Sequence, residues 1–221
     1  MSTKKENIEL RKKVVEELEF DPGIDASAIG VGVEDGIVSL TGHVTSYAEK
    51  TAAEQIVKRV QGVEGVANDV EVKLRSSLDR DDADVARAAV HRLEWHVSIP
   101  KDHVQVIVKE GWVTLEGTVD WHYQKRAAED AVFVLAGVRG ITNNILVTGV
   151  HARPRDVKQK IEAALERNAA IDAEKIAISC DEGTVILSGT VRSWAERQDA
   201  VNAAWSAPGV TEVVDHIHIA A

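Results

Sequence analysis

A ten-residue motif occurs three times in this chain, and the repetition constrains the fold more than any other feature of the sequence. The copies are residues 35–44, 110–119 and 182–191, and each has an acidic residue and a glycine, then alternating apolar residues and a second glycine. They are spaced 75 and 72 residues apart, and a Gly-Val pair follows each second glycine by 20 residues. Landmarks that keep the same register predict three structural units of about 73 residues.

Within each unit the spacing of apolar residues changes in the same order. Apolar residues recur first at every fourth position, which is typical of one face of a helix, and then at every second position, which is typical of a half-buried strand. The motif predicts a second strand, joined to the first by an acidic-Gly hairpin turn. An alanine-containing helix and a closing strand follow. The pattern predicts an α+β fold of three tandem α-β-β-α-β units, each a three-stranded sheet with two helices on one face.

The expected unit boundaries are residues 5–75, 82–149 and 153–221, with short polar joints between them. The two helices of a unit can cover only one face of its sheet, so the other face stays open. Units this small are only marginally stable alone. We therefore expect the open sheet faces to form the contacts between units.

Charge and composition exclude several classes of protein. With 44% hydrophobic and 28% charged residues the chain is globular, and its net charge of −10 disfavours binding to nucleic acid or to an anionic membrane surface. Its one cysteine excludes an internal disulfide framework. No apolar run is long enough for a transmembrane segment or, near the N-terminus, for a signal peptide. We expect a cytoplasmic protein, or a periplasmic one if the chain is a trimmed mature form.

The motif glycines are interpreted as structural residues. A phosphate-binding glycine loop leads from a strand into a helix, whereas the first glycine of each motif lies between two strands. We expect positive φ at these turn positions and a close helix approach at the second glycines. The turn glycines are Gly36, Gly111 and Gly183, and the second glycines are Gly42, Gly117 and Gly189.

No group of residues predicts catalysis, a metal site or a cofactor. No nucleophile lies in an elbow motif, and no carboxylate pair has an apolar setting. Cys180 occupies an inward strand position and is interpreted as a small buried hydrophobe. His216 and His218 share one side of the last strand, but two histidines make a weak site, so a solvated strand edge is the preferred interpretation. We expect no enzymatic activity.

Aromatic residues concentrated in unit two are the main functional candidates. The core stripe of the second helix runs through neighbouring positions, so we expect these aromatic side chains to be partly exposed. Exposed aromatics suit contact with a partner or a lipid surface, and packing between units is the alternative. The best single candidate is Trp112 on the open sheet face. The candidates for partner or lipid contact are Trp95, Ile107, Trp112, Trp121 and Phe133.

Each unit resembles the BON domain. The resemblance rests on the pattern Gly-x-Val-x-Leu-x-Gly-x-Val, followed by an alanine-rich helix, a Gly-Val pair and a strand with Asn68, Asn143 or Asp215 before it. This family is named after bacterial osmotically induced and nodulation proteins, and the resemblance covers nearly the whole chain. It implies a non-catalytic, stress-associated protein that binds phospholipid or envelope proteins. The alternative is a cytoplasmic sensor of a small monovalent cation such as potassium, or a protein interaction scaffold.

Overall fold

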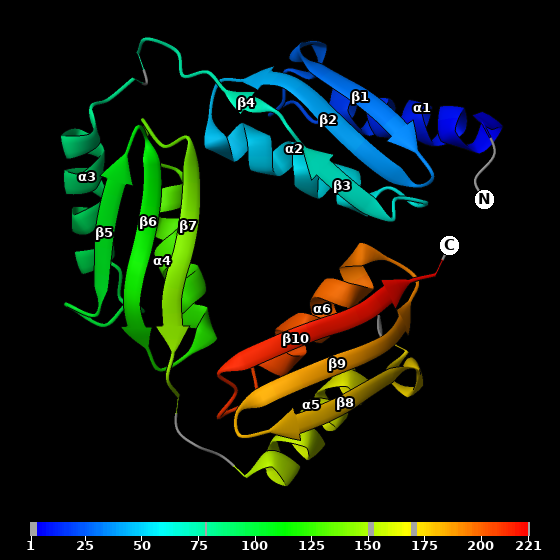
Figure 1. Cartoon of the computed structure of the whole chain (residues 1–221). Helices are drawn as coiled ribbons and strands as arrows, with labels where there is room; N and C mark the ends of the chain where they lie inside the picture. The colour runs from blue at the N-terminus through cyan, green and yellow to red at the C-terminus, as the bar shows by residue number, and fades with distance from the viewer. Residues whose placement is uncertain (1–3, 78, 150–152, 169–171, 221) are drawn as a thin grey trace.

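The computed structural model describes residues 4–77, 79–149, 153–168 and 172–220, which form three similar units (Figure 1). Unit one contains α1 (Lys4–Phe20), β1 (Ile29–Glu34), β2 (Ile37–Val44), α2 (Tyr47–Arg59), β3 (Gly65–Asn68) and β4 (Glu71–Val72). Unit two contains α3 (Asp82–Glu94), β5 (Val104–Lys109), β6 (Trp112–Val119), α4 (His122–Phe133) and β7 (Gly140–Val147). Unit three contains α5 (Pro154–Arg167), β8 (Ile176–Asp181), β9 (Thr184–Val191), α6 (Trp194–Trp205) and β10 (Glu212–Ile219). The predicted α+β fold of three tandem units is confirmed.

Each sheet has the same topology. The first two strands form an antiparallel hairpin, and the closing strand lies parallel to the second, so the strand orders are β1-β2-β3, β5-β6-β7 and β10-β9-β8. In unit one β4 also pairs with β2, in the same direction as β3. The two-residue turn between β1 and β2 has φ of 47° at Asp35 and 78° at Gly36. Positive φ at both positions matches the right-handed twist of the paired strands.

The second glycine of each motif allows a close backbone approach. A Cβ at Gly42 would overlap the carbonyl oxygen of Ala28, and Gly117 meets His103 in the same way. These carbonyls belong to the residue just before the first strand, because that strand begins opposite the glycine. The close neighbour is therefore the start of the hairpin, and not one of the two α-helices that cover the sheet.

Each unit encloses its own hydrophobic core between the sheet and its two helices. The inward positions of the central strand are fully buried, as at Val38 and Leu40 in unit one. The first helix contributes every fourth residue and the second helix contributes small or β-branched residues. The buried helix residues of unit one are Leu10, Val14, Leu18, Ala53, Ile56 and Val57. Three separate cores make each unit a folding module with its own apolar interior.

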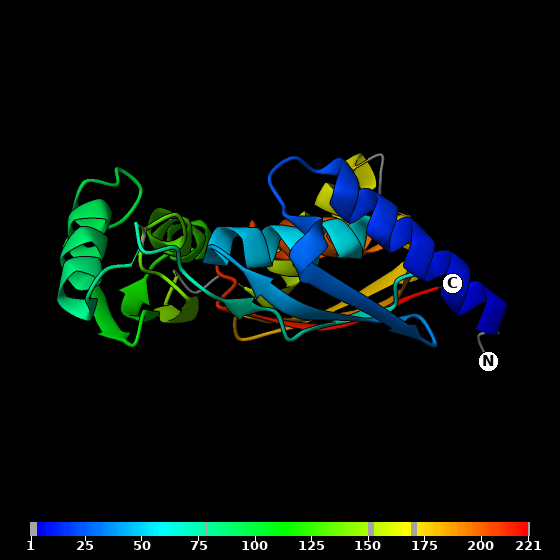
Figure 2. The same ribbon diagram turned by 90° about the horizontal axis from the view of Figure 1, so that it is seen from above.

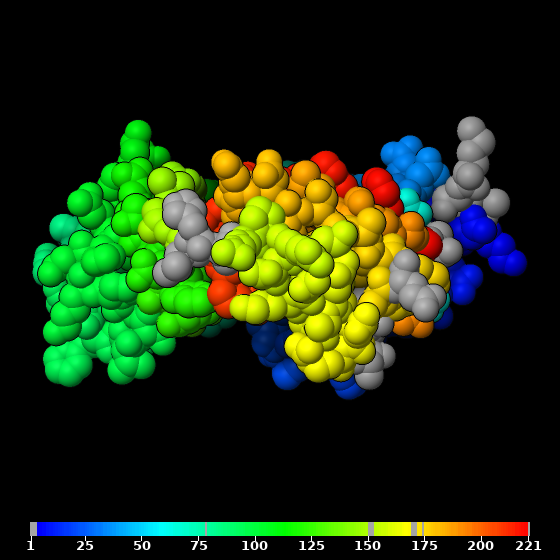
Figure 3. All heavy atoms as spheres, turned by 90° about the horizontal axis from the view of Figure 1, so that it is seen from below, coloured from blue at the N-terminus to red at the C-terminus, as the bar shows by residue number. Residues whose placement is uncertain are grey.

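The three units contact one another through α2, α4 and α6. The first residue of each of these helices meets a residue at the end of the next unit's helix, and the positions are equivalent in the three repeats. The contacts are Tyr47 with Phe133, His122 with Trp205 and Trp194 with Lys58. Units one, two and three therefore close into a triangle by one contact used three times (Figure 1). Figure 3 shows units two and three packed directly together in the view from below.

The expectation that open sheet faces join the units is wrong. In unit one the outward sheet positions carry small residues such as Gly30, Gly32 and Ala67, which offer little apolar area to bury. The second helices instead present large rings beside their core stripes, and burying an aromatic ring stabilises a contact far more. With the helices turned to one another, the strands lie along one side of the molecule and the helices along the other (Figure 2).

Candidate binding site between units two and three

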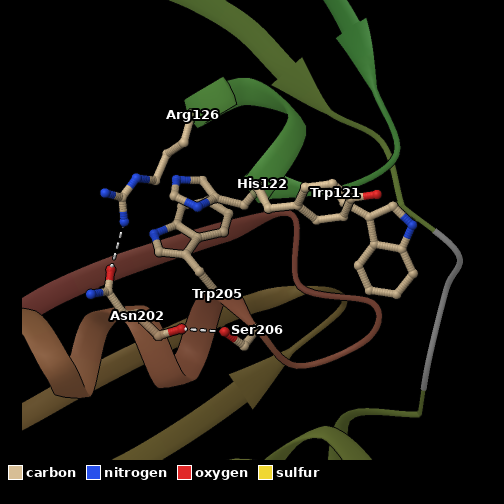
Figure 4. Close-up of a pocket in the computed structure, with 7 residues that line it drawn as sticks. Trp121, His122, Arg126, Asn202, Trp205 and Ser206 are labelled. Atoms are coloured by element: carbon tan, nitrogen blue, oxygen red, sulfur yellow. Dashed lines mark hydrogen bonds between the residues drawn. The ribbon is translucent and has the colours of Figure 1, made fainter. Parts of the chain in front are cut away.

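An open hollow of about 700 Å³ lies where the start of α4 meets the end of α6 (Figure 4). It combines aromatic rings with a guanidinium, an amide and a hydroxyl group. Both units contribute to its walls, so the hollow forms only when the two units are docked. Its lining residues are Trp121, His122, Tyr123, Arg126, Asn202, Trp205 and Ser206.

The floor of the hollow is a stacked pair of rings that joins the two units. The centroids of His122 and Trp205 are 3.9 Å apart and their planes differ by 12°. Burial, together with the positive charges of Lys125 and Arg126, lowers the pKa of His122 to about 4. The imidazole is therefore neutral at pH 7 and packs as an uncharged ring. Arg126 adds a second link, because its Nη1 donates to Asn202 Oδ1 at 3.4 Å.

The rim of the hollow offers accessible groups of two kinds. Trp121 is 37% exposed and Tyr123 is 57% exposed. Arg126 is also exposed and lies on the far side of the stacked pair from Trp121 (Figure 4). Aromatic rings with polar edges suit a surface that is apolar on one side and wet on the other. The guanidinium can form two parallel hydrogen bonds with a phosphate or carboxylate.

The first turn of α4 lacks a carboxylate that the other two second helices have. Glu49 and Glu196 accept backbone N–H groups in front of α2 and α6. The equivalent residue in unit two is Gln124, whose Oε1 accepts the N–H groups of Asp120 and Trp121 at 3.1 and 3.0 Å. The amide accepts the N–H of Asp120, which is equivalent to Thr45 and Arg192, without adding a negative charge. An anion at the hollow therefore meets one repulsive charge fewer than at the equivalent place in the other units.

Trp112 and Ile107 lie on the open face of the unit-two sheet. Trp112 is 50% exposed, and its Nε1 donates to Thr142 Oγ1 at 2.8 Å. Its ring lies over Gly140, where any Cβ would overlap it. Ile107 is 52% exposed on the neighbouring strand. The two side chains form an apolar surface whose only indole N–H is already bonded within the sheet.

The other predicted contact residues lie apart from this surface. Trp95 follows the last turn of α3 and is 76% exposed, with its ring 5.7 Å from that of His91. Phe133 lies in the joint between units one and two, where its ring meets Tyr47 edge to face at 5.8 Å. The structure thus brings Trp121 to the hollow, Trp112 and Ile107 to the open sheet, and Phe133 to a joint.

The remaining sequence candidates show no reactive arrangement. Cys180 is partly buried against the core of unit three, and burial raises the pKa of its thiol. His216 and His218 are both exposed on β10. In the part of the chain that the structure describes, no three His, Cys, Asp or Glu residues are grouped to hold a metal ion. None of the described helices is both long and apolar enough to cross a membrane.

The sequence did not single out Tyr123 or Arg126, whereas Trp205 was expected to be partly exposed and to serve either partner contact or packing between units. A signal was present for Trp205, because it occupies the position of Phe133 in unit two and of Lys58 in unit one. Large aromatic residues in two repeats at a position that is charged in the third indicate a contact made outside the unit core.

The BON domain family matches this chain three times, over residues 9–73, 81–149 and 155–221. Osmotically-inducible protein Y of Escherichia coli (strain K12) is 29% identical over 126 residues, an alignment that covers 55% of this chain and 63% of that protein. The chain thus spans less than two thirds of the length of this relative.

Two solved structures resemble the chain weakly. CdsD, a structural protein of the type III secretion system of Chlamydia trachomatis, has 15% identity and a TM-score of 0.27, with 96% of this chain and 92% of that chain covered. The PrgH periplasmic domain has 10% identity and a TM-score of 0.23, with 87% and 95% covered. TM-scores this low do not indicate a shared arrangement of the whole chain.

Proposed function

Because the chain belongs to the BON domain family through all three of its units, we propose that it is a non-catalytic binding protein of the bacterial osmotic stress response. Its similarity to an osmotically inducible protein supports the stress association. We further propose that it contacts phospholipid headgroups of the cell envelope through the hollow between units two and three. The observation that carries this proposal is that exposed Trp121, Tyr123 and Arg126 line the same hollow.

The chemistry of the rim fits a phospholipid at the membrane surface. Trp and Tyr side chains favour the boundary between headgroups and acyl chains, where an apolar ring and a polar edge are both satisfied. Arg126 can hold the phosphate with two N–H donors. The net charge of −10 opposes long-range attraction to an anionic bilayer, so recognition must come from these local contacts.

Flotation with vesicles of phosphatidylethanolamine and phosphatidylglycerol tests the proposal. Arg126→Gln should weaken association about tenfold, because a hydrogen bond to a charged group contributes about 1.5–3 kcal/mol. Tyr123→Ala should weaken it through loss of apolar contact. Matched controls are Arg87→Gln and Phe20→Ala, since both residues are exposed and lie outside the hollow. Wild-type binding by Arg126→Gln, or failure of the wild type to float, would contradict the proposal.

Trp112 and Ile107 are proposed as a second, weaker lipid contact. Their surface is apolar, and the indole N–H of Trp112 is engaged by Thr142, so this face offers no free donor to a headgroup from that side chain. In the same flotation assay Trp112→Ala should reduce association less than Arg126→Gln does. Equal or larger loss, at an unchanged unfolding midpoint, would place the main contact on the open sheet instead.

A further inference from the structure

The contact between units three and one closes the triangle without a chain connection. Trp194 donates its indole N–H to the carbonyl oxygen of Val63 at 3.1 Å. The ammonium of Lys58 lies 5.3 Å, and the guanidinium carbon of Arg197 4.9 Å, from the centroid of the Trp194 ring. We call this contact, from residues 58–64 of unit one to residues 192–194 and 219–220 of unit three, the seam.

The seam encloses a cavity of about 210 Å³. Its apolar wall includes Val60 and Ile219, and its cationic groups are Lys58, Arg59 and Arg192. A volume of this size holds about seven water molecules. The cavity is therefore large enough for a small organic molecule, and too small for a lipid chain or a peptide.

The three cationic residues of the seam have no cationic counterparts in the other repeats. The equivalents of Lys58 are Phe133 and Trp205, those of Arg59 are Val134 and Ser206, and those of Arg192 are Thr45 and Asp120. Two of the cations come from unit one and the third comes from unit three. The three cations come together only because these two units dock. They form a local positive group in a chain whose net charge is −10.

The positive charge of the cavity is only partly compensated. Lys58 forms an ion pair with Glu54 at 2.6 Å, and Arg192 Nε lies 3.4 Å from Glu196 Oε2. Arg59 forms no ion pair with any residue that the structure describes. Glu64, the carboxylate in the described lining, packs its side chain against the Gly36 turn. An anion in this cavity would find a guanidinium that no carboxylate in the described chain occupies.

We propose that the seam cavity binds a small organic carboxylate. The carboxylate group pairs with Arg59 and Arg192, and an apolar body packs against Val60 and Ile219. Such a ligand touches both unit one and unit three, so binding favours the closed triangle over an open chain of units. The site lies at a different joint from the phospholipid hollow, and either proposal can fail without the other.

Benzoate is the probe that separates charge from shape. Benzamide has nearly the same shape without the charge, and acetate has the charge without the apolar body. Calorimetric titration of the full chain at pH 7 should show one benzoate site, with benzamide and acetate at least about tenfold weaker. Benzoate should also raise the unfolding midpoint as its concentration increases.

Arg59→Gln is the decisive variant, because Arg59 is exposed and its loss breaks no ion pair in the described chain. It should weaken benzoate binding about tenfold and leave the ligand-free unfolding midpoint unchanged. Arg126→Gln, at the other joint, should keep wild-type affinity for benzoate. Any one of three results would overturn the proposal. Benzamide could bind as tightly as benzoate, Arg59→Gln could bind benzoate as tightly as the wild type, or the wild type could show no benzoate binding up to the solubility limit.

Discussion

Trp194→Ala should open the triangle while leaving all three units folded. Trp194 is half-buried in the seam and is not part of a unit core. Burying half of an indole removes about 125 Å² from water, or about 3 kcal/mol at 25 cal/mol per Å². Its hydrogen bond to Val63 adds about 1 kcal/mol, so truncation costs about 4 kcal/mol before any cation–π contribution. That loss lowers the ratio of closed to open molecules about a thousandfold.

Small-angle X-ray scattering, with circular dichroism on the same samples, measures this prediction. The radius of gyration should rise in Trp194→Ala, and the helix and strand signals should stay at wild-type values. Trp194→Phe retains a ring but loses the N–H donor, so its effect should be smaller. Tyr123→Ala serves as a control because that exposed ring lies at another joint and does not close the seam. An unchanged radius of gyration in Trp194→Ala would refute the assignment of this residue to ring closure.

Three further predictions concern a turn glycine, a histidine at a joint and the response to potassium. Gly111→Val should lower the stability of unit two by at least about 2 kcal/mol, because Gly111 has φ of 77° and a Cβ there would lie 2.6 Å from the carbonyl oxygen of Gly137. Thermal unfolding checks this against Gly32→Val, where a Cβ would make only ordinary van der Waals contact with Ser39. The contact between units two and three should contribute about 1 kcal/mol less to stability as pH falls from about 6.5 to about 4. Burial holds the pKa of His122 in the folded chain at about 4, so His122 in the unfolded chain takes up its proton at a higher pH. Unfolding midpoints across this range should vary less in His122→Gln than in the wild type. Potassium, compared with sodium at equal ionic strength, should not change the radius of gyration, and a potassium-selective compaction would favour the cation-sensor alternative.

The unit fold could be predicted from the sequence because its determinants are local and occur in triplicate. The alternation through Val38 and Leu40 fixes which strand face is buried, and the Asp35-Gly36 pair fixes the turn. Both signals require only neighbouring residues. The repeat then excludes chance matches, since the same signals return at Gly111 and Gly183.

The joints could not be predicted in the same way. Phe133 was identifiable as a position beside the core stripe, but nothing in a single helix says which other helix its ring meets. The hollow depends on this missing information, because Trp121 and Arg126 come from one unit and Asn202 from another. The expectation of sheet-to-sheet contact failed for the same reason, because the residues that join the units lie at the ends of the second helices and their partners are in other units.

The triangle explains why the three repeats have diverged at equivalent positions. Each joint pairs one variable residue with another, so Tyr47 meets Phe133, His122 meets Trp205 and Trp194 meets Lys58. Exchanging two units would bring unmatched partners together, for example the cation of one joint against the imidazole of another. The cores have no such constraint and keep nearly the same apolar residues in all three units. Divergence at the joints therefore gives each joint a different chemistry: two packed rings between units one and two, a neutral imidazole stacked on an indole beside a guanidinium between units two and three, and a cationic cavity at the seam.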